Sequence, residues 1–171
     1  MVCFDTLDEP NPRRDTMEKK EMQAALAGCE FFQGLQAADL DKLLPLCNAK
    51  NYKSGEVVFT QGTDGEYLYV IVSGQVVLER AIDLGVRKGT VTIEALEKGR
   101  VLGCWSTLLG EQHILMSSAV CQKPTRLLTL RGADLRYLMH SNKDLGFNVM
   151  EKFCFLLRDR VQAAYGALEK I

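Results

Sequence analysis

The feature that most constrains this chain is a series of short apolar segments separated by glycines. Nine of its 14 glycines lie between residues 55 and 110. Between and beyond them stand runs rich in valine, tyrosine, phenylalanine and leucine: EVVFTQG, YLYVIVSG, QVVLER, TVTIEAL and TRLLTL. Short strands joined by glycine-bearing turns are typical of an antiparallel barrel or sandwich. We therefore expect residues 51–131 to form a barrel.

Two local patterns refine this expectation. The stretch VIVSGQVVLE predicts a β-hairpin with Ser73-Gly74 at its turn. The stretch DLGVRKG, residues 83–89, predicts a polar loop between two further strands.

Helical patterns flank the barrel segment on both sides. Residues 1–15 are polar, contain two prolines and predict an irregular lead. Residues 16–48 predict N-terminal helices, and residues 132–171 predict C-terminal helices. The chain therefore predicts one domain over 16–171, mainly β with helices at both ends.

The last predicted helix, for which Ser141 is the expected cap, carries the most regular pattern in the chain. Apolar residues alternate at spacings of three and four, the heptad pattern of a helix that pairs with another helix. They are Phe147, Met150, Cys154, Leu157, Val161, Ala164, Leu168 and Ile171. The helix either packs only on its own barrel or pairs with a partner helix. A helix over 147–171 is about 37 Å long, more than a small barrel covers, which favours a homodimer.

Composition and charge argue against several classes of function. The formal net charge of −1 does not suggest a nucleic-acid binder. The six cysteines have no paired spacing, so reduced thiols in a cytoplasmic protein fit better than a zinc site or disulfides. No apolar run approaches the roughly 18 residues of a membrane span. No arrangement of nucleophile and base has the context of a catalytic site, so we do not expect an enzyme.

Over about residues 31–160 the chain resembles the cyclic-nucleotide-binding domain family. The shared motifs are a Phe-x-x-Leu opening, an aromatic residue, a Gly-Glu strand turn, a glycine turn before a tyrosine, and a Ser-Gly turn. In this sequence they are Phe32, Leu35, Tyr52, Gly55-Glu56, Gly62, Tyr69 and Ser73-Gly74. IEALEKGRVLG, at 93–103, resembles the approach to the family's phosphate-binding cassette, and PTRLLTLRGADLRYLM, at 124–139, resembles the strand and helix that come after the cassette.

The resemblance implies a jelly-roll barrel, or double-stranded β-helix, with N-terminal helices and a long C-terminal helix that closes a ligand pocket. It also implies a sensor, in which a ligand in the barrel moves the helix and the helix reports to an effector domain or a dimer partner. Only 11 residues follow Arg160. We therefore expect a stand-alone member of the bacterial type without a DNA-binding domain.

The stretch GRVLGCWSTLLGEQHILMSSAV, residues 99–120, departs from the family's cassette. Members that bind cyclic AMP or cyclic GMP carry Gly-Glu, a short helix and Arg-Ser/Thr-Ala; the glutamate binds the ribose and the arginine the phosphate. Here cysteine replaces the glutamate, and the arginine position falls on Leu115 or Met116. We expect a degenerate ligand site. Its residues are Gly103, Cys104, Trp105, Ser106, Leu115, Met116 and Ser117.

The expected function is a regulatory module that binds a non-standard small effector, or cyclic AMP or cyclic GMP only weakly. The alternative is a ligand-free dimerisation or interaction module whose pocket Leu115, Met116 and Trp105 fill. A haem or redox sensor, with His113 or Cys104 as the reactive group, is a third hypothesis. Trp105 is expected either in the core or stacked on a ligand.

Overall fold

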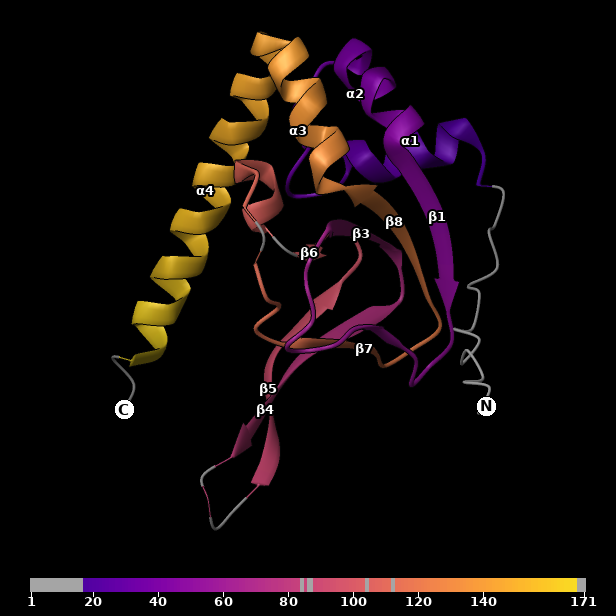
Figure 1. Ribbon diagram of the computed structural model, residues 1–171. Coiled ribbons are helices and arrows are strands. Elements are labelled where there is room, and N and C mark those ends of the chain that lie inside the picture. The colour runs from indigo at the N-terminus through magenta and orange to yellow at the C-terminus, as the bar shows by residue number, and fades with distance from the viewer. Residues whose placement is uncertain (1–16, 84, 86–87, 104, 112, 169–171) are drawn as a thin grey trace, which may run out of the picture.

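The structure, a computed structural model, describes residues 17–168 with the exception of 84, 86–87, 104 and 112 (Figure 1). The predicted irregular lead and Cys104 therefore lie outside the described residues. Two helices and a 3-10 turn precede the first strand: α1 (Lys19–Ala27), α2 (Ala37–Leu43) and η1 (Leu44–Leu46). The chain ends in α3 (Gly132–Ser141) and the long α4 (Lys143–Leu168).

Eight strands make up the body of the described chain. They are β1 (Cys47–Tyr52), β2 (Val57–Phe59), β3 (Tyr67–Ser73), β4 (Gln75–Asp83), β5 (Lys88–Glu97), β6 (Val101–Gly103), β7 (Ser118–Cys121) and β8 (Thr125–Arg131). They form two antiparallel four-stranded sheets, in the orders β1-β8-β3-β6 and β2-β7-β4-β5. The predicted jelly-roll with N-terminal helices and a long C-terminal helix is confirmed.

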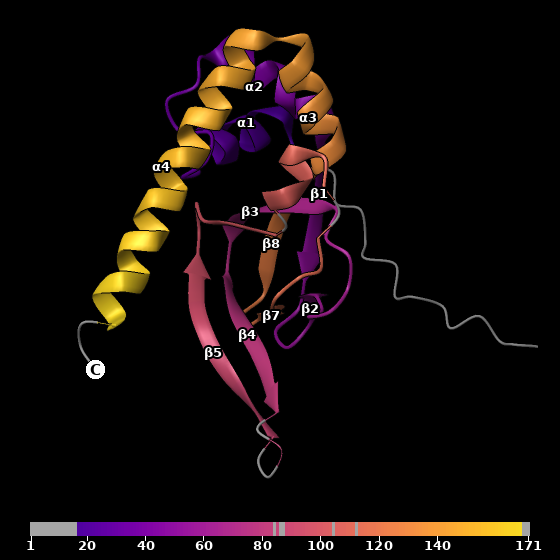
Figure 2. The same ribbon diagram turned by 60° about the vertical axis from the view of Figure 1, so that its left-hand side comes forward.

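The helices gather at one end of the two sheets, and the β4–β5 hairpin projects from the other end (Figures 1 and 2). One sheet is buried on both faces, as β8 illustrates. Leu127 belongs to the cluster between the sheets, whereas Leu128 belongs to the cluster that also holds Leu26, Phe31 and Val149 of the helical segments. The apolar run of β8 thus serves two cores, which fixes the helices on the barrel.

The predicted hairpin at Ser73-Gly74 is wrong, because β3 and β4 belong to different sheets. Gly74, with a φ of 96°, carries the chain from one sheet to the other. The next residue, Gln75, exchanges hydrogen bonds with Thr125 Oγ1. The hairpin that does form joins β4 and β5 around the predicted polar loop.

Two predicted boundaries also need correction. β1 begins at Cys47, inside the segment assigned to helices, because Cys47 and Ala49 alternate into the core as strand residues do. The cap of α4 is Asn142, whose side-chain oxygen accepts the amide hydrogen of Leu145 at 3.2 Å. Ser141 instead donates its hydroxyl hydrogen to the carbonyl oxygen of Tyr137 in the preceding helix. Among the described residues, no helix has the length and apolar character needed to cross a bilayer.

Replacing Gly74 by alanine tests the corner between the sheets. A Cβ atom there would collide with Thr125 and lie 2.6 Å from the carbonyl oxygen of Pro124, and the positive φ adds backbone strain. We expect Gly74→Ala to lower the free energy of unfolding by about 2 kcal/mol or more, measured by urea denaturation. Gly89→Ala, where a Cβ meets nothing within 4 Å, is the control. Equal stability of the two variants would contradict this role.

Candidate functional site

The stretch that resembles the phosphate-binding cassette connects β6 to β7. A side chain at Gly103, whose φ is 118°, would collide with the carbonyl oxygen of Tyr67, because β6 and β3 lie backbone to backbone there. Glycine at this position is therefore required by packing. The 3-10 helix η2 (Trp105–Leu109) follows, and Gly110 continues the turn with a φ of 77°.

Trp105, the only tryptophan of the chain, lies between the barrel and α4. Its ring is 5.4 Å from the ring of Phe31 and 5.4 Å from that of Phe153 on α4. The guanidinium of Arg160 lies over the same ring, 5.3 Å from its centroid. Trp105 is partly buried against the core shared by the helices and the barrel. It therefore joins the cassette segment to the C-terminal helix.

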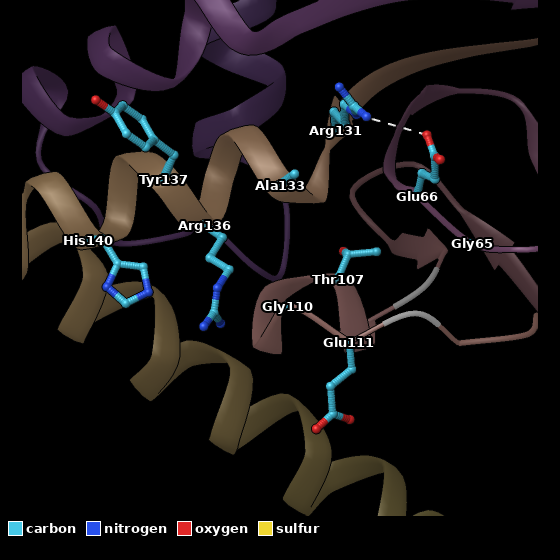
Figure 3. A pocket seen from close by; sticks show the side chains of 10 residues that line it. All are labelled: Gly65, Glu66, Thr107, Gly110, Glu111, Arg131, Ala133, Arg136, Tyr137 and His140. Atoms are coloured by element: carbon cyan, nitrogen blue, oxygen red, sulfur yellow. Dashed lines mark ion pairs between the residues drawn. The ribbon is translucent and has the colours of Figure 1, made fainter.

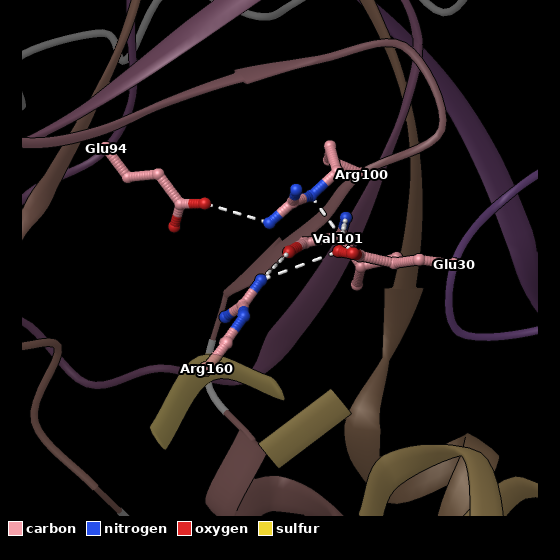
Figure 4. Close-up of polar contacts among 5 residues, drawn as sticks. All are labelled: Glu30, Glu94, Arg100, Val101 and Arg160. Carbon is pink, nitrogen blue, oxygen red and sulfur yellow. Dashed lines mark hydrogen bonds and ion pairs between the residues drawn. The ribbon is translucent and has the colours of Figure 1, made fainter. Parts of the chain in front are cut away.

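Arg160 also makes polar contacts that fix α4 (Figure 4). Its Nη2 atom donates to the carbonyl oxygen of Val101 at 3.0 Å and lies 3.5 Å from Glu30 Oε1. Glu30 Oε1 accepts the amide hydrogen of Val101 at 2.9 Å, and Glu30 Oε2 pairs with Arg100 Nε at 3.0 Å. Arg100 pairs in turn with Glu94 at 2.8 Å. This Glu30–Arg160 network ties the segment after α1 to β6 and α4.

A small cavity of about 160 Å³ lies at the mouth of the barrel beside the cassette segment. Its lining includes the aromatic residues Phe59, Tyr67 and Tyr69, the acidic residues Asp64 and Glu66, and Leu115. None of the described residues that line it is lysine or arginine. Burial raises the pKa of Tyr69, so its phenol stays protonated at neutral pH. The cavity is below the roughly 300 Å³ at which small-molecule pockets begin, and its charges are negative.

The structure separates the predicted ligand-site residues. Leu115 is buried and lines the small cavity, and the side chain of Met116 is 54% exposed. Trp105 packs toward α4 and is not part of that lining. Ser117 directly precedes the Ser118-Ala119 pair that opens β7 and is half-buried. Ser106, in η2, is half-buried, and its backbone oxygen accepts the amide hydrogen of Glu111 at 3.2 Å.

The heptad stripe lies on the outer side of α4. The face that packs on the rest of the protein consists of Leu145, Val149, Phe153 and Leu156. The predicted stripe lies beside this face and is largely exposed to solvent. The exposed fraction is 69% for Phe147, 41% for Leu157 and 51% for Val161. Cys154 is also exposed, and Met150 is half-buried. Ala164 and Leu168 fall in α4, but their side chains are outside the description. Figures 1 and 2 show the C-terminal half of α4 standing away from the sheets.

The structure describes one of the two residues proposed for haem or redox chemistry, His113, while Cys104 lies outside the described residues. His113 is exposed in the loop after η2. Within the described residues, no group of three or more histidine, cysteine, aspartate or glutamate side chains could hold a metal ion. Burial raises the pKa of Cys29 to about 11 and of Cys47 to about 12. These thiols stay protonated, which makes them unreactive at neutral pH.

A larger cleft of about 580 Å³ lies on the other side of η2, against α3 (Figure 3). Its charged lining residues are Glu66, Glu111, Arg131 and Arg136, with His140 beside them. The sequence reasoning missed this cleft. The spacing of Arg136 and His140, four residues apart on a helix, was the available signal that they share a face.

The comparisons with known proteins agree with the fold. The sequence pattern of the family described as cyclic nucleotide-binding domain matches residues 49–142, more than half of the chain. The chain belongs to the cyclic nucleotide-binding domain family.

Relatives of this cyclic nucleotide-binding domain occur in longer proteins. A Rhodopseudomonas palustris protein whose name describes it as a potassium channel protein is 33% identical over 81% of this chain and 31% of its own length. The cyclic AMP receptor protein of Thermus thermophilus is 32% identical over 61% of this chain and 46% of its own length. The chain thus spans less than half the length of either relative.

A solved structure gives the same fold. The cyclic nucleotide-binding domain from Methylobacillus flagellatus superposes with a TM-score of 0.74 at 23% identity, over 89% of this chain and 83% of that one. At this level of identity the likeness concerns the fold.

Replacing Arg160 by glutamine tests the contact between α4 and the cassette segment. The variant loses the cation–π contact with Trp105 and the ion pair with Glu30, so we expect it to lose about 1–2 kcal/mol of stability. Trp105, the only tryptophan, should become more accessible to iodide in fluorescence quenching. Arg158→Gln is the matched control, since Arg158 pairs with its neighbour Asp159 on the outer surface. Identical quenching in both variants would contradict the contact.

Proposed function

We infer that this chain is a regulatory domain of the cyclic nucleotide-binding type that signals as a homodimer through α4. The observation that carries the proposal is the exposed apolar stripe of that helix, formed by Phe147, Cys154, Leu157 and Val161. An apolar helix face of this length in water is costly unless another surface covers it. A second copy suits it, because a heptad pattern is self-complementary across a two-fold axis.

The proposal includes a cassette that does not hold cyclic AMP or cyclic GMP in the family's usual way. None of Leu115, Met116 and Ser117 supplies a positive charge at the arginine position. The adjacent cavity is lined by Asp64 and by Glu66, which pairs with Arg131. A cyclic phosphate there would meet negative charges without a bidentate cation. Loss of such a charged contact costs roughly 2–5 kcal/mol. Because each 1.4 kcal/mol changes the dissociation constant about tenfold, the loss weakens binding by roughly one to four powers of ten.

The size of the cassette cavity favours a second candidate function. At about 160 Å³ it holds only a few water molecules rather than a nucleotide. Under this alternative the barrel is a ligand-free interaction module, and dimerisation through α4 is its whole function. The two candidates share the α4 contact and differ in whether any effector acts on it. Neither candidate function includes a catalytic step. Both place the protein in the cytoplasm, where the free cysteines of the described chain would stay reduced.

Two glutamates on the exposed stripe test the homodimer. We expect Leu157→Glu with Val161→Glu to raise the dimer dissociation constant about a hundredfold or more, because charged groups would be buried at the contact. Size-exclusion chromatography with light scattering should then give the monomer mass at micromolar concentration. Gln162→Glu, an exposed neighbour outside the stripe, should leave the dimer mass unchanged. A dimer that survives the double substitution, or a wild-type chain that is monomeric, would contradict the proposal.

A further inference from the structure

The cleft between η2 and α3 has the size and lining of a small-molecule site. We propose that it binds a small organic acid with one carboxylate, a hydroxyl or ammonium group, and an aromatic body. Its volume of about 580 Å³ lies within the range of ligand pockets, roughly 300–1,000 Å³. The cleft adjoins the cassette cavity, with which it shares Gly65 and Glu66, and it does not depend on α4 pairing.

Arg136 is the anion-binding group of this site. It projects from α3 toward the turn at Gly110 (Figure 3) and is half-buried. Its Nη1 atom donates to the carbonyl oxygen of Leu108 at 2.6 Å, its hydrogen-bond partner among the described residues. This bond fixes the plane of the guanidinium, whose other N–H groups remain to bind a carboxylate in a bidentate manner. A fixed arginine loses less entropy on binding than a mobile one.

The surrounding charges select a monocarboxylate over a phosphate. Arg131 and Glu66 form an ion pair at 3.9 Å at the rim of the cleft and largely offset each other. Glu111 supplies a second carboxylate on the wall formed by the turn after η2 (Figure 3). A doubly charged phosphate would be repelled by Glu111, whereas a hydroxyl or ammonium group beside a single carboxylate can donate to it. The ligand is therefore an α-hydroxy or α-amino acid.

The remaining lining favours an aromatic or other apolar body. Tyr137 follows Arg136 on α3, and its side chain is 76% exposed along the wall of the cleft. Ala133, one helical turn before Tyr137, presents only a methyl group, which leaves space for a ring beside Tyr137. His140 lies one helical turn beyond Arg136 and adds a polar edge.

A ligand in this cleft would act on the helix that signals. It would contact α3 and the turn after η2 together, and η2 carries Trp105, which stacks on Phe153 of α4. The start of α3 already touches η2, because a Cβ atom at Gly132 would collide with Thr107. A ligand that holds η2 against α3 would therefore stabilise the surface on which α4 packs.

Titration by ¹H–¹⁵N NMR with four probes tests the site: L-phenylalanine, 3-phenyllactate, phenyl phosphate and phenethylamine. We expect the first two to bind with millimolar or tighter dissociation constants and to shift the amides of Gly110, Arg136 and Tyr137. Phenyl phosphate and phenethylamine should bind at least tenfold more weakly, since one is repelled by Glu111 and the other lacks the carboxylate.

Variants separate the proposed contacts from general effects on folding. Arg136→Gln should weaken phenyllactate binding at least tenfold, and Tyr137→Ala, at an exposed position, should weaken it several-fold. Arg158→Gln, on the outer face of α4, should leave it unchanged. Three results would overturn the proposal: no binding of either acid at 10-fold molar excess over millimolar protein, equal binding by phenyl phosphate or phenethylamine, or shifts confined to the cassette cavity around Asp64 and Leu115.

Discussion

One side chain of α4, Arg160, anchors the second half of the helix through three partners from distant parts of the chain. Its guanidinium contacts Glu30, the carbonyl oxygen of Val101 in β6 and the ring of Trp105. Because Glu30 also accepts the Val101 amide hydrogen, the same carboxylate contacts both β6 and α4. The surroundings are only partly exposed, so these contacts are stronger than those of a surface ion pair.

The helix α4 has two apolar faces, one packed against the protein and one exposed. The face containing Val149, Phe153 and Leu156 belongs to the protein's own core, and the adjacent stripe with Leu157 and Val161 is turned to solvent. If a second copy covers the stripe, as proposed, a change in η2 would reach α4 through Trp105, and a change in α4 would reach that partner surface. In the proposed function this is the path of the signal, and the cleft behind η2 is a place where a small molecule could start it.

Much of the fold could be predicted from the sequence, because its signals are local. The glycine-separated strands and the heptad spacing indicated the barrel and the long helix correctly. The sheet assignment of β3 and β4 could not be predicted, since alternation in VIVSGQVVLE is the same in a hairpin and in a corner between sheets. Periodicity likewise found the stripe of α4 but not its buried face one residue earlier, because apolar residues cover both.

The candidate site was harder to predict. The network around Arg160 joins residues 130 positions apart, and no local pattern in the sequence indicates such a pair. The position of Trp105 also depends on this long-range packing. The η2–α3 cleft combines residues from three separate segments, so only the structure brings them together.

In the proposed function the cassette segment lacks the charge needed to hold a cyclic phosphate. Isothermal titration calorimetry of the purified chain with cyclic AMP and cyclic GMP tests it most directly. We expect dissociation constants weaker than about 0.1 mM, because Leu115, Met116 and Ser117 offer no cation and Asp64 repels the anion. Binding of either nucleotide at micromolar concentration or tighter, about −8 kcal/mol or better, would contradict it.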